Sequence, residues 1–422
     1  MRKFALAATA VAALSVGLQT PAFAAAPDAP TDFKISLVDM HVHLTWADDN
    51  AKNIVYVEQE GQAPYAAATV LETAPNDLSL PAFRIKESDK TRLIVKSEVG
   101  GELSEGAVSD WFDTHRPAAP ALKDANLAAN LTTTLSWTLG AVADSTPNDP
   151  LDVPGDGAVT ADVDLPGANG ATVNFDRGAT SGTIAPQARP AAIKLSAYND
   201  WGYGPSDTRI VRLGTLGAGV TVPASAVYGS RLGIKSTLDL FTSEGREERA
   251  SGIPVELQAR ATATAPWKTY GRYAGNTTAA FDTGIASLGN RQYRLWVPAR
   301  KAVSANTIAL TPAISTSAKS SKTLIKFVSN GFTPGTARPG ANSDLTAKIQ
   351  PASTVKGVLQ EWGGKTWGNV FAVQFSKGSL VVHGSAGTDR GTYKFRISLP
   401  AVTVNGLTLS PTTSGAFTLT VR

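Results

Sequence analysis

Short runs of alternating apolar and polar residues recur along the chain, and this pattern limits the possible fold more than any other feature. In one run, Val42, Leu44 and Trp46 fall on one face, and His41 and His43 fall on the other. A period of two residues is typical of a half-buried β-strand. Similar alternation occurs at residues 131–139, 193–197, 255–259, 393–399 and 417–421. Gly, Pro, Asn and Asp interrupt the runs, and no long amphipathic helix follows the first two dozen residues. We therefore expect an all-β fold of tandem antiparallel β-sandwiches.

Three stretches rich in proline, glycine or serine divide the strand pattern into four segments. They cover residues 116–121, 213–223 and 311–322, and each is a candidate linker because such residues interrupt a sheet ladder. The segments have the length of one sandwich, about 100 residues, and each holds two of the eight tryptophans. The predicted boundaries are 27–117, 118–214, 215–315 and 316–422.

Segments three and four repeat each other. The sequence VELQAR precedes Trp267, and the sequence VLQEW precedes Trp367. In both segments the next tyrosine lies 26 residues after that tryptophan, at Tyr293 and Tyr393, where the similar stretches YRLWVPA and YKFRISLPA begin. Equal gaps between similar residues indicate an internal repeat. We interpret the two segments as copies of one kind of sandwich.

The first two segments resemble fibronectin type III domains. Trp46 in HLTW and Trp137 in TLSW stand where that family has the tryptophan of its second strand. The stretch SAYNDWGYGPSD resembles the late signature of the family through Ala197, Asn199, Gly202, Gly204, Pro205 and Ser206. Two positions depart from the family, because Ile193 and Leu93 stand in place of its corner tyrosine.

Segments three and four resemble the bacterial Ig-like repeats of exported actinobacterial proteins, through the LQ…W and Y-x-F/L elements quoted above. Together the two resemblances imply tandem fibronectin III-like and Ig-like sandwiches over nearly all of residues 27–422. They imply no particular activity, because such sandwiches host many functions.

The first residues have the pattern of a secretory signal peptide. A basic start, Met1-Arg2-Lys3, precedes a largely apolar stretch and the sequence Pro21-Ala22-Phe23-Ala24. We predict a signal peptide over residues 1–24, with cleavage after Ala24 or Ala26, and a protein that is secreted, extracellular or loosely held at the cell surface. No later stretch reaches about 18 apolar residues, so we expect no transmembrane segment. The absence of cysteine excludes disulfides, thiolate metal sites and a cysteine nucleophile.

Charge is divided unevenly along the chain. Segment one carries 8 basic and 16 acidic side chains, net −8, and segment two carries 6 and 10, net −4. Segment three carries 11 and 6, net +5, and segment four carries 12 and 3, net +9. Such asymmetry points to charged partners, although an ordinary solvated surface is the alternative. We expect the basic half to bind an anionic envelope polymer or a glycan, with head-to-tail self-association as another possibility. No recognition helix or nucleic-acid motif is present, so no nucleic acid is expected as a partner.

The candidate ligand-binding residues lie in the two basic segments. The strand pattern places Trp296 on the face opposite its buried neighbours and beside Arg294. The same register turns Trp362 outward, and Arg396 occupies the outward side of the matching strand. An exposed tryptophan beside a cation is a platform for a sugar ring or an anion; packing against a neighbouring sandwich is the alternative.

A calcium site is a second hypothesis. Eight aspartates and no basic residue lie between Lys123 and Arg177, and Asp149, Asp152 and Asp156 crowd one loop rich in Gly and Pro. Calcium takes six to eight oxygen ligands, which such a loop offers. The alternative is an acidic, solvated loop, because the spacing lacks the regular pattern of an EF-hand.

No catalytic residue is predicted. We find no Gly-x-Ser-x-Gly turn, no His-Glu-x-x-His helix and no phosphate-binding glycine loop. His41 and His43 share a strand face, but zinc requires three or four ligands. The sequence therefore favours a non-enzymatic, modular binding or adhesion protein. The alternatives are a structural spacer, a self-assembling subunit and, less favoured, a hydrolase whose site has no recognisable motif.

Overall fold

The computed structural model describes residues 26–422 apart from residues 50, 153–156, 245–246, 250–251 and 276–279. The predicted signal peptide at 1–24 lies outside the described residues. Apart from one short 3₁₀ helix, η1 (Ala82–Arg84), the regular elements of the described chain are strands. The expected all-β class is therefore confirmed. Within the described residues, no helix has the length and apolar character needed to span a membrane.

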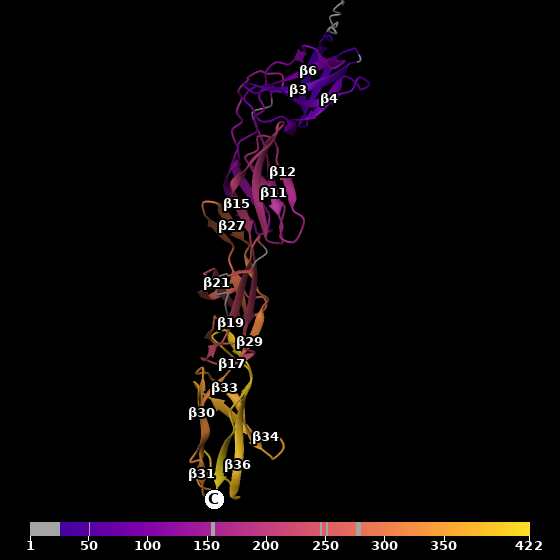
Figure 1. The fold of residues 1–422 in the computed structure, drawn as a ribbon. Coiled ribbons are helices and arrows are strands. Elements are labelled where there is room, and N and C mark those ends of the chain that lie inside the picture. Colours follow the sequence, from indigo (N-terminus) through magenta and orange to yellow (C-terminus); the bar gives the residue numbers. More distant parts are fainter. Residues whose placement is uncertain (1–25, 50, 153–156, 245–246, 250–251, 276–279) are drawn as a thin grey trace, which may run out of the picture. The chain divides into compact units, whose positions relative to one another are not determined.

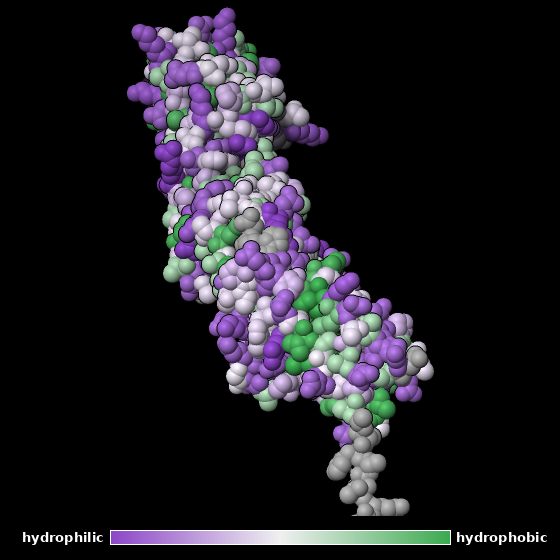
Figure 2. Space-filling model, turned by 90° about the horizontal axis from the view of Figure 1, so that it is seen from above, coloured by the Kyte–Doolittle hydropathy of each residue, from purple (hydrophilic) through white to green (hydrophobic). Residues whose placement is uncertain are grey.

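The chain forms two compact units. The first unit contains the described residues of Met1–Ala118, Gly140–Ala158 and Ala197–Pro205. The second unit contains Ala119–Leu139, Val159–Ser196 and the described residues of Ser206–Arg422. Hydrophilic residues cover most of the visible surface, and hydrophobic residues gather in local patches (Figure 2).

The first sandwich packs a three-stranded sheet against a larger antiparallel one. Its three-stranded sheet has the order β1 (Thr31–Val38), β2 (His41–Ala47), β5 (Asp77–Pro81). The other sheet has the order β4 (Tyr65–Val70), β3 (Lys52–Gln59), β6 (Thr91–Val99), β7 (Glu102–Leu103), with β8 (Ala107–Val108) paired to β6. Trp46 lies on the second strand and is 6% exposed, as the resemblance to fibronectin type III domains implies, and Leu93 faces the same core.

The core of the first unit also contains residues from segment two. Leu151 and Trp201 are each 2% exposed and belong to the same apolar cluster as Trp46. The Trp201 ring stacks on Phe112, with ring centroids 5.6 Å apart and planes inclined by 5°. Residues 140–158 and 197–205 therefore complete the first unit, although the sequence pattern places them in the second segment.

The second sandwich has a three-stranded sheet and a six-stranded sheet. The first contains β13 (Ser181–Ile184), β10 (Thr133–Thr138) and β9 (Ala121–Leu127). The second has the order β12 (Ala171–Asn174), β11 (Ala158–Asp164), β14 (Ala191–Asn199), β15 (Gly202–Leu213), β27 (Thr307–Thr311), β26 (Arg300–Val303). Trp137 on β10 and Ile193 on β14 are buried in its core.

The last two strands of the six-stranded sheet come from segment three. Strand β27 runs parallel to β15, so that Val211 lies opposite Ile308 and Leu213 lies opposite Leu310. In Figure 1 the orange-brown β27 lies beside the magenta β15. Ile308 and Leu310 are buried in the core of the second sandwich. The hairpin β26–β27 belongs to the third segment but extends the larger sheet of the second sandwich.

The third sandwich also has two main sheets. One contains β16 (Thr215–Thr221), β19 (Lys235–Phe241) and β20 (Glu247–Arg249), with β23 (Phe281–Asp282) paired to β19. The other has the order β17 (Ser225–Val227), β29 (Lys319–Leu324), β25 (Arg291–Val297), β21 (Pro254–Arg260), β22 (Lys268–Ala274), with β28 (Ile314–Ser315) paired to β25. A small sheet joins β18 (Arg231–Leu232) to β24 (Ile285–Ala286). The stretch 311–322, expected as a linker, contains β28 and most of β29, because Ser321 and Thr323 alternate into the core.

The fourth sandwich repeats the strand order of the third. Its smaller sheet contains β30 (Lys326–Thr333), β32 (Asp344–Gln350) and β35 (Ser379–Val382). Its larger sheet has the order β31 (Thr336–Ala337), β40 (Phe417–Val421), β36 (Gly391–Leu399), β33 (Val355–Trp362), β34 (Trp367–Phe375), with β39 (Thr412–Thr413) paired to β36. A hairpin of β37 (Val402–Val404) and β38 (Leu407–Leu409) corresponds to β26–β27. The internal repeat is therefore visible strand by strand.

The hairpin of the fourth sandwich reaches back as well. Just after β38, Ser410 forms a parallel bridge with Leu324 at the end of β29. The Asn290 N–H donates to the Thr408 carbonyl at 2.7 Å, and the Asn290 side-chain oxygen accepts the Thr323 N–H at 2.7 Å. Asn290 Nδ2 also donates to Ser410 Oγ at 3.1 Å. Segments three and four thus each contain a hairpin that contacts the last strand of the preceding sandwich. We call β26–β27 and β37–β38 the reach-back hairpins.

Candidate functional site

The outer face of the larger sheet in the third sandwich holds an arginine between a glutamine and a tryptophan. Arg294 on β25 lies opposite Gln258 on β21, and its Nε donates to Gln258 Oε1 at 2.9 Å. Its guanidinium carbon lies 4.4 Å from the centroid of the Trp267 ring. We call Gln258, Arg294 and Trp267 the third-sandwich ladder. A guanidinium over an aromatic face gains cation–π attraction while it keeps its hydrogen bond.

The fourth sandwich holds the same arrangement at the equivalent strands. Arg396 on β36 lies opposite Gln360 on β33, and its Nε donates to Gln360 Oε1 at 2.8 Å. Its guanidinium carbon lies 4.4 Å from the centroid of the Trp367 ring. We call Gln360, Arg396 and Trp367 the fourth-sandwich ladder. Two copies of one geometry on equivalent strands make this face the strongest candidate site.

The ladders correct the alignment of the two repeats. Because Arg294 and Arg396 occupy the same register, Tyr293 corresponds to Phe395 and not to Tyr393. Trp267 and Trp367 are equivalent in the two ladders, but their spacing from the ladder glutamine differs. The turn between β21 and Trp267 is two residues longer than the turn between β33 and Trp367. The equal 26-residue gap in the sequence therefore joins two tyrosines that are not equivalent.

Two neighbouring positions beside the ladders differ between the sandwiches. In the third sandwich, Arg260 places a second guanidinium 4.4 Å from the Trp267 centroid, and its Nε donates to Gln292 Oε1 at 2.8 Å. The equivalent position in the fourth sandwich is Trp362, whose ring centroid lies 5.3 Å from that of Trp367, with planes inclined by 56°. By the same register Gln292 corresponds to Lys394, so the third sandwich has Arg260 and Gln292 where the fourth has Trp362 and Lys394.

The ladder arginines have neutral partners. Within the described residues, no carboxylate forms an ion pair with Arg260, Arg294 or Arg396. Burial, together with the nearby Arg260 guanidinium, lowers the pKa of Arg294 below the ordinary arginine value. Glu256 on the same face is already engaged: it accepts from the Thr269 hydroxyl at 2.6 Å and from Arg272 at 3.1 Å. Glu256 also accepts from Nε2 of the ladder glutamine Gln258 at 3.2 Å, so on this face Arg272 is paired with a carboxylate whereas Arg260 and Arg294 are held by glutamine and tryptophan alone.

The structure places the predicted ligand-binding residues on these two faces. Trp296 is half-buried on β25, on the same outward side as Arg294, and lies opposite Glu256. Trp362 is 38% exposed at the end of β33, two residues after the ladder glutamine Gln360.

The sequence interpretation missed the glutamines and stacking tryptophans of both ladders. These residues are Gln258, Gln360, Trp267 and Trp367. The repeated LQ and the tryptophan that follows it in each segment were the signal, but the role of these residues follows only from the cross-strand register.

The predicted calcium residues lie in the first unit. Asp149 and Asp152 line a small pocket together with Asp113, Asp144 and Trp201. Asp149 is already bonded: it accepts from the Leu151 N–H at 2.6 Å, the Thr146 hydroxyl at 2.9 Å and the Asp113 N–H at 3.2 Å. Asp156 lies outside the described residues. Among the residues that the structure describes, no three carboxylates or imidazoles form a group suited to a metal ion.

We expect the Asp149 carboxyl to titrate above the ordinary aspartate pKa of about 3.9. Burial raises its pKa, and the hydrogen bonds from Leu151 and Thr146 only partly offset that effect. A raised folded-state pKa contributes stability below the unfolded pKa, and this contribution is lost as pH rises through the folded value. Carbon-13 NMR of labelled aspartates in the full chain measures the shift. Asp124 serves as the reference, because its hydrogen bond from Lys301 lowers its pKa.

The same titration tests the calcium hypothesis. A calcium ion on Asp149 and Asp152 favours the ionised carboxylates, so added calcium chloride is expected to lower the apparent pKa of Asp149 and to leave Asp124 unchanged. Equal titration curves with and without calcium would contradict a calcium site on these residues.

Histidine chemistry offers no better site. The rings of His41 and His43 lie 6.4 Å apart on one strand face. His115 Nε2 lies 3.0 Å from Ser145 Oγ, and its Nδ1 lies 3.6 Å from Glu87 Oε1, which resembles a serine–histidine–acid arrangement. However, Asp89 Oδ1 also lies 3.0 Å from Nε2, so a carboxylate competes for the nitrogen that would deprotonate the serine. The contacts of this cluster tie residues 140–158 to the first sandwich.

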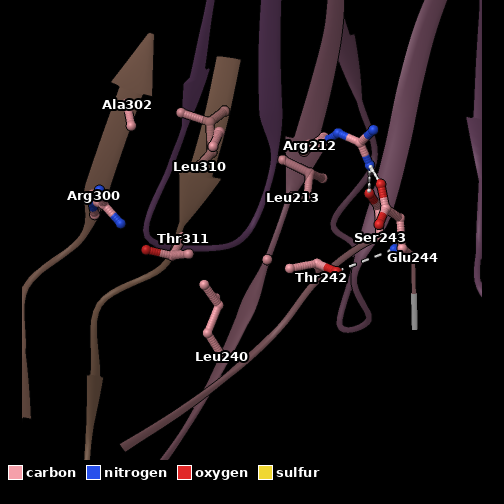
Figure 3. A pocket seen from close by; sticks show the side chains of 12 residues that line it. Arg212, Leu213, Leu240, Thr242, Ser243, Glu244, Arg300, Ala302, Leu310 and Thr311 are labelled. Carbon is pink, nitrogen blue, oxygen red and sulfur yellow. Dashed lines mark hydrogen bonds and ion pairs between the residues drawn. The ribbon is translucent and has the colours of Figure 1, made fainter. Parts of the chain in front are cut away.

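A pocket of about 290 Å³ lies in the second unit beside the hairpin β26–β27. Figure 3 shows Arg212 on one side of it, with Ser243 and Glu244 next to the guanidinium. Arg212 Nη1 lies 2.8 Å from Glu244 Oε1 and 3.0 Å from Ser243 Oγ. Glu244 pairs with Arg212 and leaves Arg300 as the second arginine of the lining, so this pocket combines a carboxylate with its cations and is a weaker candidate for an anion than the ladders.

Comparisons with known proteins give the fold little support and the function none. No protein-family model matches the chain, and no curated protein matches it. Among solved structures, the FN1–FN3 domains of chicken CNTN1 match with 12% identity and a TM-score of 0.21, over 69% of this chain and 98% of that chain. A two-domain fibronectin type III segment from chicken tenascin matches with 12% identity and a TM-score of 0.20, over 42% and 96%. At these TM-scores the likeness carries no argument. The fold rests on the strand order, and the resemblance of segments three and four to exported Ig-like repeats stays a prediction.

Proposed function

We propose that the chain is a non-enzymatic, modular extracellular protein whose third and fourth sandwiches bind an anionic polymer, such as an envelope polymer or an acidic glycan. The observation that carries this proposal is the set of three guanidiniums, Arg260, Arg294 and Arg396, each fixed by a neutral glutamine and a tryptophan. Secretion is part of the proposal and depends on the predicted signal peptide.

A fixed guanidinium is well prepared for an anion. Its Nε is used by glutamine, so the terminal N–H groups remain to donate to a carboxylate, sulfate or phosphate. Because the stack already orders the side chain, binding costs less conformational entropy than it would for a free arginine. The surrounding charge adds long-range attraction, since segments three and four carry +5 and +9.

We expect the double variant Arg294→Ala/Arg396→Ala in the full chain to bind immobilised polygalacturonate and polyphosphate about 10–100-fold more weakly, because each removed group makes charged hydrogen bonds. Biolayer interferometry at low and moderate salt measures this loss. The matched control is Arg338→Ala/Lys348→Ala, which removes two cations from the fourth sandwich outside the ladder face.

Equal losses for the two double variants would show that net charge, and not the ladders, governs binding. A wild-type chain that binds neither polymer would overturn the proposed function. Thermal unfolding of each variant separates a binding loss from a folding loss. A third variant, Arg294→Lys/Arg396→Lys, keeps the charge but not the fork geometry and is expected to fall between the wild type and the double alanine.

A second candidate is a structural spacer or self-assembling subunit. The observation that favours it is the reach-back hairpin, which joins the second, third and fourth sandwiches through shared sheets and hydrogen bonds. The opposite charges of the two halves would support head-to-tail pairing. Sedimentation velocity over a range of concentrations tests this: association at low salt that disappears at high salt supports it, and a single monomeric species under both conditions contradicts it.

A further inference from the structure

We propose that the fourth sandwich recognises the sugar rings of an acidic polysaccharide, with Trp362 as the stacking surface and Arg396 and Lys394 as the partners of its anionic groups. This inference rests on the proposed binding of an anionic polymer and names its chemical class. It is carried by the position beside the ladder at which the third sandwich has Arg260 and the fourth has Trp362.

The Trp362 ring is the aromatic surface that the ladder leaves open. Trp367 is already covered by the Arg396 guanidinium at 4.4 Å, whereas no cation lies over the Trp362 ring within the described residues. The Trp362 side chain is 38% exposed, and its ring packs against the Trp367 ring with the two centroids 5.3 Å apart. A large, rigid, half-exposed indole suits the apolar C–H face of a sugar ring.

The turn that follows leaves room for a ligand. Gly363 and Gly364 come directly after Trp362, and neither has a side chain that could cover the ring. Gly364 has φ +88°, which disfavours other residues, and a Cβ built there would meet no atom within 4 Å. The left-handed backbone at Gly364 therefore favours glycine, and the space around this turn is open.

Two exposed lysines lie on the segments next to Trp362. Glu361 pairs with Phe395, and Lys394 is the next residue along β36 on the side of Trp362. Lys394 is exposed, as is Lys365 in the turn, and neither forms an ion pair within the described part of the chain. An aromatic ring flanked by free cations matches a sugar that carries a carboxylate or sulfate, rather than a neutral sugar.

The third sandwich provides an internal comparison. At the position of Trp362 it has Arg260, which adds a cation and removes the open ring. A polymer without rings, such as polyphosphate, gains from cations alone and does not need Trp362. Sensitivity to the residue at position 362 therefore distinguishes a glycan ligand from a ring-free polyanion.

The test uses the full chain with two probes, polygalacturonate and long-chain polyphosphate, and three variants. Trp362→Ala is expected to weaken polygalacturonate binding about tenfold and polyphosphate binding less than about twofold. Trp362→Arg installs the residue of the third sandwich and is expected to weaken polygalacturonate binding but strengthen polyphosphate binding. The matched control is Val370→Ala, another exposed apolar residue of this hairpin at 46% exposure, for which both affinities are expected to stay unchanged.

The outcomes separate this inference from the proposed function. If the wild type binds polyphosphate as tightly as polygalacturonate and Trp362→Ala changes neither affinity, the sugar-ring proposal is overturned while anion binding stands. If the wild type binds neither probe, the proposed function fails first. Equal losses for both probes in Trp362→Ala would also overturn the inference, because they would show that the tryptophan supports the arginine and does not contact the ligand. Unchanged thermal unfolding of the variants confirms that each one is folded.

Discussion

Replacing Trp201 with alanine is expected to lower the free energy of unfolding of the first unit by about 3–5 kcal/mol. Trp201 is 2% exposed, lies in the core of the first sandwich and stacks on Phe112 at 5.6 Å. Removing the indole leaves a cavity that backbone movement fills only partly. The effect is expected in the first sandwich, although the residue belongs to segment two.

Hydrogen exchange under increasing denaturant measures this effect locally. Amides of β3 and β6 report on the first sandwich, and those of β33 and β36 provide an internal reference in the fourth. The control variant is Tyr203→Ala, two residues away and 59% exposed, which is expected to change stability by less than about 0.5 kcal/mol. Unchanged exchange in β3 and β6 of Trp201→Ala would mean that residues 197–205 are not part of that core.

The second large effect is expected for Leu310→Ala, which should destabilise the second sandwich by about 2–5 kcal/mol. Leu310 lies on β27, is 2% exposed and pairs across the parallel strands with Leu213. A change in segment three is therefore expected to raise hydrogen exchange in β11 and β14 of segment two. If Leu310→Ala affects only the strands of the third sandwich, the hairpin contributes nothing to the second core.

A surface residue of the same hairpin is the control for this effect. Val303 is 60% exposed on β26, so Val303→Ala is expected to leave exchange in β11 and β14 within about 0.5 kcal/mol of the wild type. The pair of variants separates loss of the buried leucine from general disturbance of the hairpin.

The fold class could be predicted because strand alternation is a local signal. The runs around Trp46 and Trp137 placed each tryptophan on a buried face, and the structure buries both on the second strand of their sandwiches. The repeat of segments three and four was also visible, because its LQ and tryptophan elements occupy equivalent strands.

The exchange of elements between sandwiches could not be predicted. Leu151 lies in a loop without periodicity, and nothing in its neighbours indicates that it enters the core of the first unit. The strand β27 has an ordinary alternating pattern, but alternation does not say which sheet a strand joins. Strand β29 is rich in serine and lysine, so its sequence favoured a linker, and only pairing with β25 and β17 explains its structure.

The candidate site was partly predictable for a similar reason. Alternation placed Arg294 and Arg396 on outward faces, which the structure confirms. The glutamine that holds each arginine lies on a neighbouring strand, and the tryptophan lies at or just before the start of the next one, so their partnership depends on a register that one sequence does not reveal. The two-residue difference between the turns obscured this register further, because an alignment on the tryptophans pairs Tyr293 with Tyr393.

The reach-back hairpin β26–β27 also sets an order of events while the chain is being made. Strand β15 ends at Leu213, whereas its partner β27 begins at Thr307, so 93 residues separate the two. At a synthesis rate of roughly 5–20 residues per second, β15 waits on the order of 5–20 s for its neighbour. During that interval its edge is open to other strands. Strand β29 does not share this delay, because β17 and β25 pair with it on its two sides and Ser410 adds a single bridge, so the open edge arises once, at β15.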